Sequence, residues 1–137
     1  MYHWKTLNAE VIAEFRANAG KVARFGDLPV AILHTRGAKS GQLREVPLIV
    51  VIDGDEMLLY GTNAGATAHP VWCFNLRAHP RITVEYGSER FTADVVELPA
   101  ADAERKRQSQ AKSTPQFAEY ASSAAPRVIP VFSIRRA

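Results

Sequence analysis

The chain has 137 residues, of which 47% are hydrophobic, so it is long enough to bury the core of one domain and too short for two ordinary ones. Its formal net charge of +3 is only mildly basic and its acidic residues are spread along the chain, so a nucleic-acid-binding protein is not indicated. A single cysteine excludes an internal disulfide, charges interrupt the N-terminal segment, and no apolar run approaches the roughly 18 to 20 residues of a membrane span, so we expect a cytoplasmic protein.

The first predicted element is an amphipathic helix over residues 8–22, capped by Asn8 and ending near Gly20. Its apolar face carries residues at helical spacing, namely Val11, Ile12, Phe15, Ala19 and Val22. Ahead of this helix, Tyr2 and Trp4 form a short aromatic leader that either packs on the body or contacts a lipid or an apolar substrate. Peripheral membrane contact therefore stays open.

Six strands are expected after Pro29. They cover residues 30–35, 46–52, 57–62, 81–86, 89–98 and 128–134. Asp53-Gly54 predicts a hairpin between the second strand and the third, and Pro130 restricts the last strand to an edge or a bulge.

Helices and one small-residue loop separate these strands. The loop covers residues 62–68, and the predicted helices cover residues 70–78, 102–112 and 115–123. Strands in this order are not the βαβ alternation of a parallel sheet, and mostly antiparallel strands of this number curl into a barrel. We therefore predict a mainly β, α+β chain, folded as a single domain over residues 1–137, with helices against a small barrel.

The segment 35–48, between the first two strands, is the strongest candidate site. Three cations precede its first acid and two glycines permit tight turns; these residues are Arg36, Lys39, Arg44, Gly37 and Gly41. This composition describes an anion-binding loop. The alternative is a solvated basic hairpin tip.

Covalent and metal catalysis have little support. Cys73 lies inside an apolar helix without a histidine partner, which favours a core residue. The histidines His3, His34, His69 and His79 lack metal-site spacing, and no acids cluster with them in sequence, so no metal ion is expected. Nucleotide-binding glycine motifs are absent. These exclusions leave a site that binds a ligand without attacking it. Such a site suits an enzyme whose cofactor carries the reaction.

Two motifs connect the chain to a known family. Residues 37–48 read G-x-K-[ST]-G-x-x-R-x-x-P-L, and residues 69–76 read H-P-x-W-x-x-N-L. With the final 128–131 segment, the chain resembles the deazaflavin-dependent nitroreductase family over nearly its full length. The resemblance implies a split β-barrel that binds reduced 8-hydroxy-5-deazaflavin coenzyme (F420) and transfers hydride to a quinone, nitro or activated-alkene acceptor, with a homodimer also conceivable for this group.

The resemblance also implies a set of coenzyme-binding residues. These are Arg36, Lys39, Ser40, Gly41, Gln42 and Arg44 in the cationic segment, which hold the anionic tail; Pro47, Leu48 and Ile49 along the ring; Tyr60, Gly61, Thr62 and Asn63 across from it; and His69, Val71, Trp72 and Asn75, which complete the pocket. For Trp72 the alternative is a core aromatic on a helix.

The chain also departs from the family. Ala38 and Thr62-Asn63 stand where members often carry cations, and Arg36 is expected to compensate for one of them. In the C-terminal helix only Tyr120 keeps the hydroxyl of the family's tyrosines, so it is the candidate to orient the acceptor or donate a proton, with simple packing as the alternative. An acceptor other than a nitro drug is therefore expected. An FMN enzyme of the related split-barrel group and a non-catalytic binding module remain as alternatives.

Overall fold

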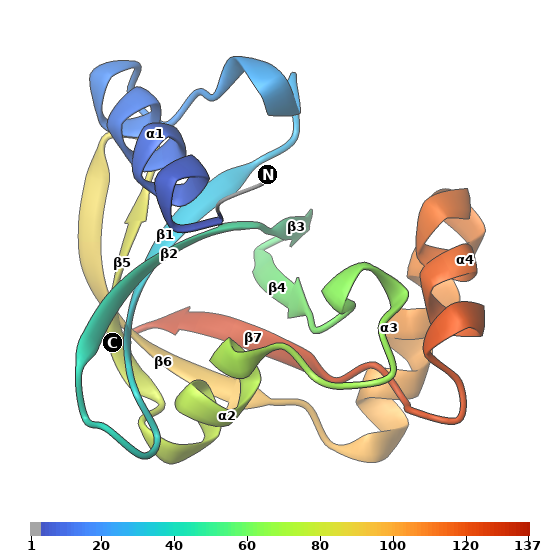
Figure 1. Ribbon diagram of the computed structural model, residues 1–137. Helices are drawn as coiled ribbons and strands as arrows, with labels where there is room; N and C mark the ends of the chain where they lie inside the picture. Colours follow the sequence, from blue (N-terminus) through green and yellow to red (C-terminus); the bar gives the residue numbers. More distant parts are fainter. Residues whose placement is uncertain (1–3) are drawn as a thin grey trace.

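The computed structural model describes the backbone of residues 4–137 and the side chains of residues 7–137 (Figure 1). Tyr2 and the side chain of Trp4 lie outside the described residues, and with them the expected aromatic contact. No helix in the described part is long and apolar enough to cross a membrane.

Within these residues, seven strands form one antiparallel sheet in the order β2-β1-β5-β6-β7-β4-β3. The strands are β1 Val30–Arg36, β2 Leu43–Ile49, β3 Val51–Asp53, β4 Glu56–Tyr60, β5 Arg81–Tyr86, β6 Glu89–Glu97 and β7 Val131–Arg136. The edge strands β2 and β3 are separated in the chain by Val50 alone, so the sheet has to curl until its two edges approach each other. The half-barrel of Figure 1 is the result, and it confirms the predicted fold class.

Two strand predictions need correction. The apolar run 46–52, expected as one strand, is two strands that pair with different partners. The break falls at Val50, which is buried and whose N–H donates to the Pro29 carbonyl at 3.0 Å. In addition, β2 begins at Leu43, so half of the expected loop is strand. Pro47 is tolerated there because β2 is an edge strand.

The last strand also begins later than predicted. Pro130 precedes β7 instead of lying within it, and its carbonyl accepts a hydrogen bond from the Gly61 N–H at 2.9 Å. A proline has no N–H to donate to a neighbouring strand, which explains why regular pairing starts after it.

Four α-helices and two short 3₁₀ turns occupy the described part of the chain. They are α1 Trp4–Ala17, η1 Ala23–Phe25, η2 Asn63–Gly65, α2 Val71–Ala78, α3 Ala100–Ser113 and α4 Pro115–Ala124. The last three agree with the predicted helices to within two residues. The predicted cap at Asn8 is wrong, because α1 starts earlier and Asn8 lies inside it. Ala19 follows α1 and is exposed, whereas Val11, Ile12 and Phe15 are buried as expected.

Gly20 lies in the turn that follows α1, and its backbone conformation requires a glycine. Its φ is +92°, and a Cβ at this position would lie 2.7 Å from the Cα of Gly87. Only glycine fits this backbone conformation and this close approach.

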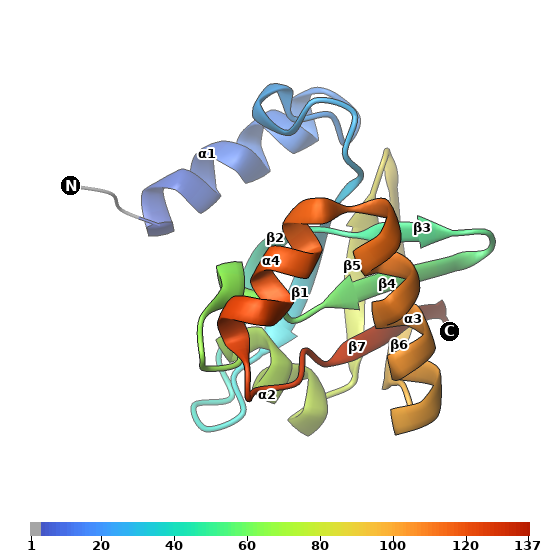
Figure 2. The same cartoon turned by 90° about the vertical axis from the view of Figure 1, so that its right-hand side faces the viewer.

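Strand β1 is buried on both faces and so joins two cores. Ala31 and Leu33 belong to the main core inside the curled sheet, whereas Val30 and Ile32 face the other way and pack with α1. Figures 1 and 2 show α1 at one end of the molecule, α2 at the other, and α3 with α4 beside β4 and β7.

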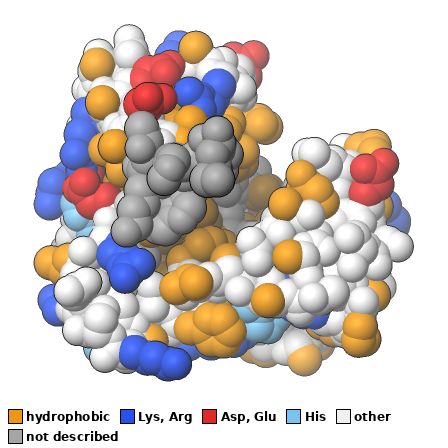
Figure 3. All heavy atoms as spheres, in the orientation of Figure 1, with side chains coloured by type: hydrophobic (Ala, Val, Ile, Leu, Met, Phe, Trp, Pro, Cys, Tyr) orange, Lys and Arg blue, Asp and Glu red, His pale blue; other side chains and the backbone are white. Residues whose placement is uncertain are grey.

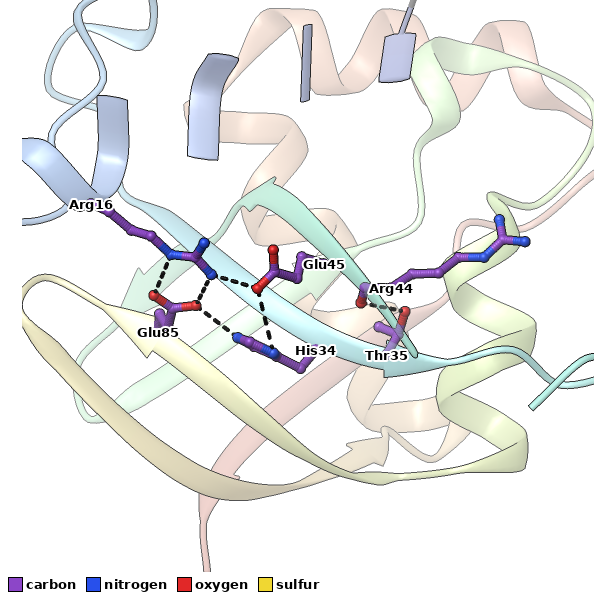
Figure 4. Close-up of polar contacts among 6 residues, drawn as sticks. All are labelled: Arg16, His34, Thr35, Arg44, Glu45 and Glu85. Atoms are coloured by element: carbon purple, nitrogen blue, oxygen red, sulfur yellow. Dashed lines mark hydrogen bonds and ion pairs between the residues drawn. The ribbon is translucent and has the colours of Figure 1, made fainter. Parts of the chain in front are cut away.

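A partly buried ion cluster fastens α1 to the sheet (Figure 4). Arg16 of α1 donates to both oxygens of Glu85, at 3.1 and 2.7 Å, and to Glu45 at 2.5 Å. His34 Nε2 lies 2.7 Å from the same Glu85 carboxylate. The arginine and the histidine hold the pKa of Glu85 well below its usual range, at about 2.

This cluster corrects one sequence-based expectation, since a histidine and two acids do lie together. The register places Glu45 directly opposite His34 and Glu85 opposite Ile32, two residues along β1, which spacing in sequence does not reveal. Three ligand atoms of the group lie within 4.8 Å of one another. Arg16 already donates hydrogen bonds to both carboxylates of the group. The absence of a metal centre stays a prediction.

The cluster predicts how stability depends on pH. A carboxyl whose pKa falls from 4.5 to about 2 on folding contributes up to about 3 kcal/mol when ionised, fully above pH 4.5 and progressively less as the pH falls through 2. Glu85→Gln should therefore lower the free energy of unfolding at about pH 7, and the difference from the unsubstituted protein should shrink towards pH 2.

Urea unfolding across this pH range measures the effect. Glu89→Gln is the matched control, because its ion pair with Arg136 is exposed and such pairs contribute about 0 to 1 kcal/mol. If Glu85→Gln lowers the free energy of unfolding by the same amount at both ends of the pH range, the stabilising role assigned to the Glu85 carboxylate is contradicted.

Candidate functional site

A cleft of about 670 Å³ lies between the β2 edge, the segment after β4, and the start of α2. In Figure 3 the molecule is hollowed between the body that carries α1 and the part that carries α3 and α4, and apolar side chains gather along the floor. The cleft is lined by Asn8, Phe25, Arg44, Glu45, Val46, Pro47, Leu48, Ile49, Tyr60, Thr62, Asn63, Ala64, His69, Pro70, Val71, Trp72 and Asn75. Eleven of the predicted site residues are in this set.

Trp72 and Tyr60 connect the cleft walls to the core. The indole of Trp72 meets the Phe132 ring edge-on at 5.7 Å, so Trp72 packs on the core and also lines the cleft, and its role toward a coenzyme stays a prediction. The Tyr60 ring packs on Phe117 of α4 at 5.2 Å, and its hydroxyl donates to the Lys106 carbonyl at 3.3 Å. Burial raises the pKa of Tyr60. These contacts fix the wall opposite β2.

The cationic segment divides between two faces. In an antiparallel pair, directly opposed side chains share a face. Arg44 is opposite the buried Thr35 and reaches the cleft, whereas Arg36 is opposite Leu43 on the other face. Arg36 instead lines a separate depression with His79 and Arg81, and its guanidinium donates to the Gly41 carbonyl at 2.8 Å. Arg36 therefore lies outside the cleft lining, and its expected role as a replacement for a missing cation stays a prediction.

The turn between β1 and β2 is held by its own hydrogen bonds and by α2. The Gln42 N–H donates to Ser40 Oγ at 3.2 Å, and the Ala38 N–H donates to Asn75 Oδ1 at 2.9 Å. Asn75 is buried, so it positions this turn in addition to lining the cleft. Lys39, Ser40, Gly41 and Gln42 stay outside the cleft itself. Lys39 is exposed at the tip of the turn.

Gly61 also lies outside the cleft lining. Its place in the structure is explained by close packing against the core. A Cβ at Gly61 would lie 2.8 Å from Cys73 Sγ and 2.9 Å from Pro130 Cγ. Cys73 is fully buried in the main core, and burial raises the pKa of its thiol to about 12, as expected for a structural cysteine. This confirms that Cys73 is a core residue.

Tyr120 is half-buried on α4 and is not among the residues that line the cleft. Its backbone packs against η2, since a Cβ at Gly65 would lie 3.2 Å from the Tyr120 Cα. From α4 it is Phe117 that reaches a cleft residue, Tyr60. The role assigned to Tyr120 stays a prediction.

Arg127 organises the loop between β4 and α2, and no local pattern in the sequence marks it. Its Nη1 donates to the Gly61 carbonyl at 2.8 Å and contacts His69 Nδ1 at 2.9 Å. Its Nη2 donates to the Thr62 and Ala66 carbonyls at 2.8 and 2.9 Å, and its Nε donates to Ala66 at 3.0 Å. All five N–H groups of the guanidinium are thus used. Arg127 therefore holds the wall of the cleft that carries Thr62, Asn63 and His69.

Comparison with known proteins agrees with this geometry. A family model described as F420H(2)-dependent quinone reductase matches residues 7–135. An F420H(2)-dependent quinone reductase of Mycobacterium tuberculosis is 35% identical over 81 residues, which cover 58% of this chain and 54% of that protein. The chain thus matches about half the length of these curated relatives.

Solved structures share the fold. An F420-H2-dependent reductase (FDR-A) is 31% identical with a TM-score of 0.66, over 78% of this chain and 94% of that chain. A second solved chain, described as a domain-swapped dimer, is 30% identical with a TM-score of 0.69, over 96% and 97% of the two chains. The split-barrel expectation is confirmed by these similarities, and the match of the family model over nearly the full length places the chain in the F420H(2)-dependent quinone reductase family.

Proposed function

We propose that this chain binds the reduced deazaflavin coenzyme F420 in the cleft and reduces a quinone with it. Membership of the F420H(2)-dependent quinone reductase family supports both the coenzyme and the acceptor, and favours them over the FMN alternative. The observation that carries the proposal is a cleft that combines Arg44, which pairs with no carboxylate among the described side chains, with an exposed strand edge and the aromatic wall of Trp72.

The cleft suits a flat ring with a charged tail. Along β2, the apolar Pro47, Leu48 and Ile49 line the cleft, and Ile49 is 44% exposed. Because β2 is an edge strand, one side of its backbone has no strand partner and can offer hydrogen bonds to a ring. Across from it stand Thr62, Asn63 and Ala64, whose small size leaves room for the ring.

The tail has a path past Arg44. A second depression, lined by α1 residues together with Gln42, Arg44 and Glu45, shares Asn8, Arg44 and Glu45 with the cleft. A phosphate or carboxylate there would meet Arg44, and Lys39 at the tip of the neighbouring turn stands as a further cation. In this proposal Arg44, Lys39, Ser40 and Gln42 hold the tail, and Val71, Trp72, Asn75 and His69 complete the ring site.

When bound, the reduced coenzyme supplies the hydride from carbon C5 of its ring. The chain contributes position and the exclusion of water, since hydride transfer needs the two carbons held at about 3 to 3.5 Å. The rigid wall built by Tyr60, Phe117 and the Arg127 contacts suits this task. A quinone is favoured over a nitro compound by the family and by the single tyrosine that α4 keeps.

The direct test mixes purified protein with reduced F420 and a panel of quinone, nitro and enone acceptors without oxygen, and follows oxidation of the coenzyme. Quinone-dependent oxidation supports the proposal. Tight coenzyme binding without oxidation by any acceptor would indicate a binding module, and binding of FMN in place of F420 would indicate the related flavin group. Pairing of two copies is supported by the similar chain described as a domain-swapped dimer, and light scattering tests it.

Arg44→Ala and Lys39→Ala should each weaken coenzyme binding, because each removes a charged hydrogen bond worth about 1 to 3 kcal/mol. We expect the larger loss for Arg44, which lies in the cleft lining. Fluorescence titration measures the dissociation constants, with the exposed Lys112→Ala as the charge-matched control. Unchanged constants for both variants would remove the cationic segment from the site.

Tyr120→Phe should change turnover more than coenzyme affinity, if the hydroxyl orients or protonates the acceptor. The substitution keeps the ring and so preserves the packing of α4 on η2. Steady-state rates with a quinone and coenzyme titration separate the two effects. A change confined to affinity, or no change in either quantity, would show that Tyr120 only packs.

A further inference from the structure

We propose that Arg127 is a positioning residue that fixes His69 as a neutral imidazole with its proton on Nε2, so that His69 presents a hydrogen-bond donor to a carbonyl oxygen of the molecule bound in the cleft. The identity of that molecule rests on the proposed function. The state of His69 does not, because it follows from contacts within this chain.

The contact between Arg127 and His69 determines the tautomer. A guanidinium is always protonated in proteins and has no acceptor, so Arg127 Nη1 can only donate across the 2.9 Å to His69 Nδ1. Nδ1 must therefore offer a lone pair, and the single ring proton of the neutral imidazole is on Nε2. A second proton, on Nδ1, would set an N–H group and a positive charge against the guanidinium.

The arrangement is rigid and keeps Nε2 available. Arg127 is itself fixed by carbonyls of three loop residues, and the His69 ring packs against the Phe74 ring at 5.9 Å. His69 lines the cleft, and no other protein group among the described residues bonds to its Nε2. Nε2 is therefore available to a molecule bound in the cleft.

The surrounding charges favour the neutral form. Burial and the positive charges of Arg127 and Arg77 lower the pKa of His69, and Glu97 acts in the opposite direction. Glu97 is largely neutralised by Arg77, which donates to both of its oxygens at 2.8 Å. The surroundings of His69 thus favour its neutral form.

A fixed neutral donor suits the proposed reaction. A carbonyl oxygen on the accepting ring gains negative charge as hydride arrives, and a preorganised N–H group stabilises that charge without reorganisation. A ring carbonyl of the coenzyme would use the same donor for orientation. Both ligands offer the same chemistry, an uncharged carbonyl oxygen, and the variants below separate them.

The first experiment reads the ring nitrogens directly. In ¹⁵N-labelled protein without coenzyme at about pH 7.5, His69 should show an unprotonated Nδ1 and a protonated Nε2. In Arg127→Met, or in Arg127→Lys if the first variant does not fold, the fixed tautomer should be lost and part of the His69 population should carry its proton on Nδ1. A protonated Nδ1 in the unsubstituted protein, or the same single tautomer in the variant, would overturn the proposal.

The second experiment compares His69→Gln, whose amide keeps an N–H donor, with His69→Leu, which has none. If the donor serves the coenzyme, its dissociation constant should rise about two- to tenfold in His69→Leu alone. If the donor serves the acceptor, kcat/KM for the quinone should fall by about the same factor at unchanged coenzyme affinity. Equal constants in all three proteins would overturn the role of the donor.

The two experiments also separate this proposal from the proposed function. A protein with the predicted His69 tautomer that fails to bind F420 would contradict the function and uphold the role of Arg127. A protein that reduces quinones while His69 carries its proton on Nδ1 would do the reverse.

Discussion

The structure depends on one constraint of the chain path, namely that the two edge strands of the sheet, β2 and β3, are joined through the single residue Val50. In a flat sheet, the two edge strands would be separated by the width of all the strands between them. A single residue cannot span that distance. The sheet therefore curls, and the chain passes from one edge to the other at Val50. Because β2 keeps one unpaired side, the curl leaves a strand edge facing α2 and the loop after β4. The cleft is a direct consequence of this closure.

Two arginines then hold segments that the curling of the sheet does not fix by itself. Arg16 ties α1 to β2 and β5 through Glu45 and Glu85, and Arg127 ties the loop after β4 by five hydrogen bonds. Both arginines use their hydrogen-bond donors for contacts within the fold. Arg44 differs, because no carboxylate in the described part of the chain pairs with it while it lines the cleft. The distinction between cations that hold the fold and a cation left for a ligand supports the assignment of the site better than net charge does.

Much of this could be predicted from the sequence, because it depends on local signals. Alternating apolar residues, the Asp53-Gly54 turn and prolines at helix starts locate most strands and helices, and the two motifs locate the family. The break at Val50 could not be predicted, because residues 46–52 read as one apolar run and only the change of strand partner divides them.

The remaining features that the sequence did not reveal share one cause, which is that they depend on pairing between distant segments. The separation of Arg36 from Arg44 follows from the β1–β2 register, which assigns them to opposite faces. The cluster of His34, Glu45 and Glu85 follows from the same register and that of β5. Arg127 donates hydrogen bonds to acceptors 58 to 66 residues away in the chain. The periodicity of apolar residues in the sequence does not predict contacts at that separation.

A crystal structure of the protein with F420 would test the central claim most directly. We expect the deazaflavin ring between the β2 edge at residues 47–49 and the segment 62–64, with an anionic group of the tail against Arg44. Coenzyme bound outside this cleft, or a tail directed away from Arg44, would contradict the account.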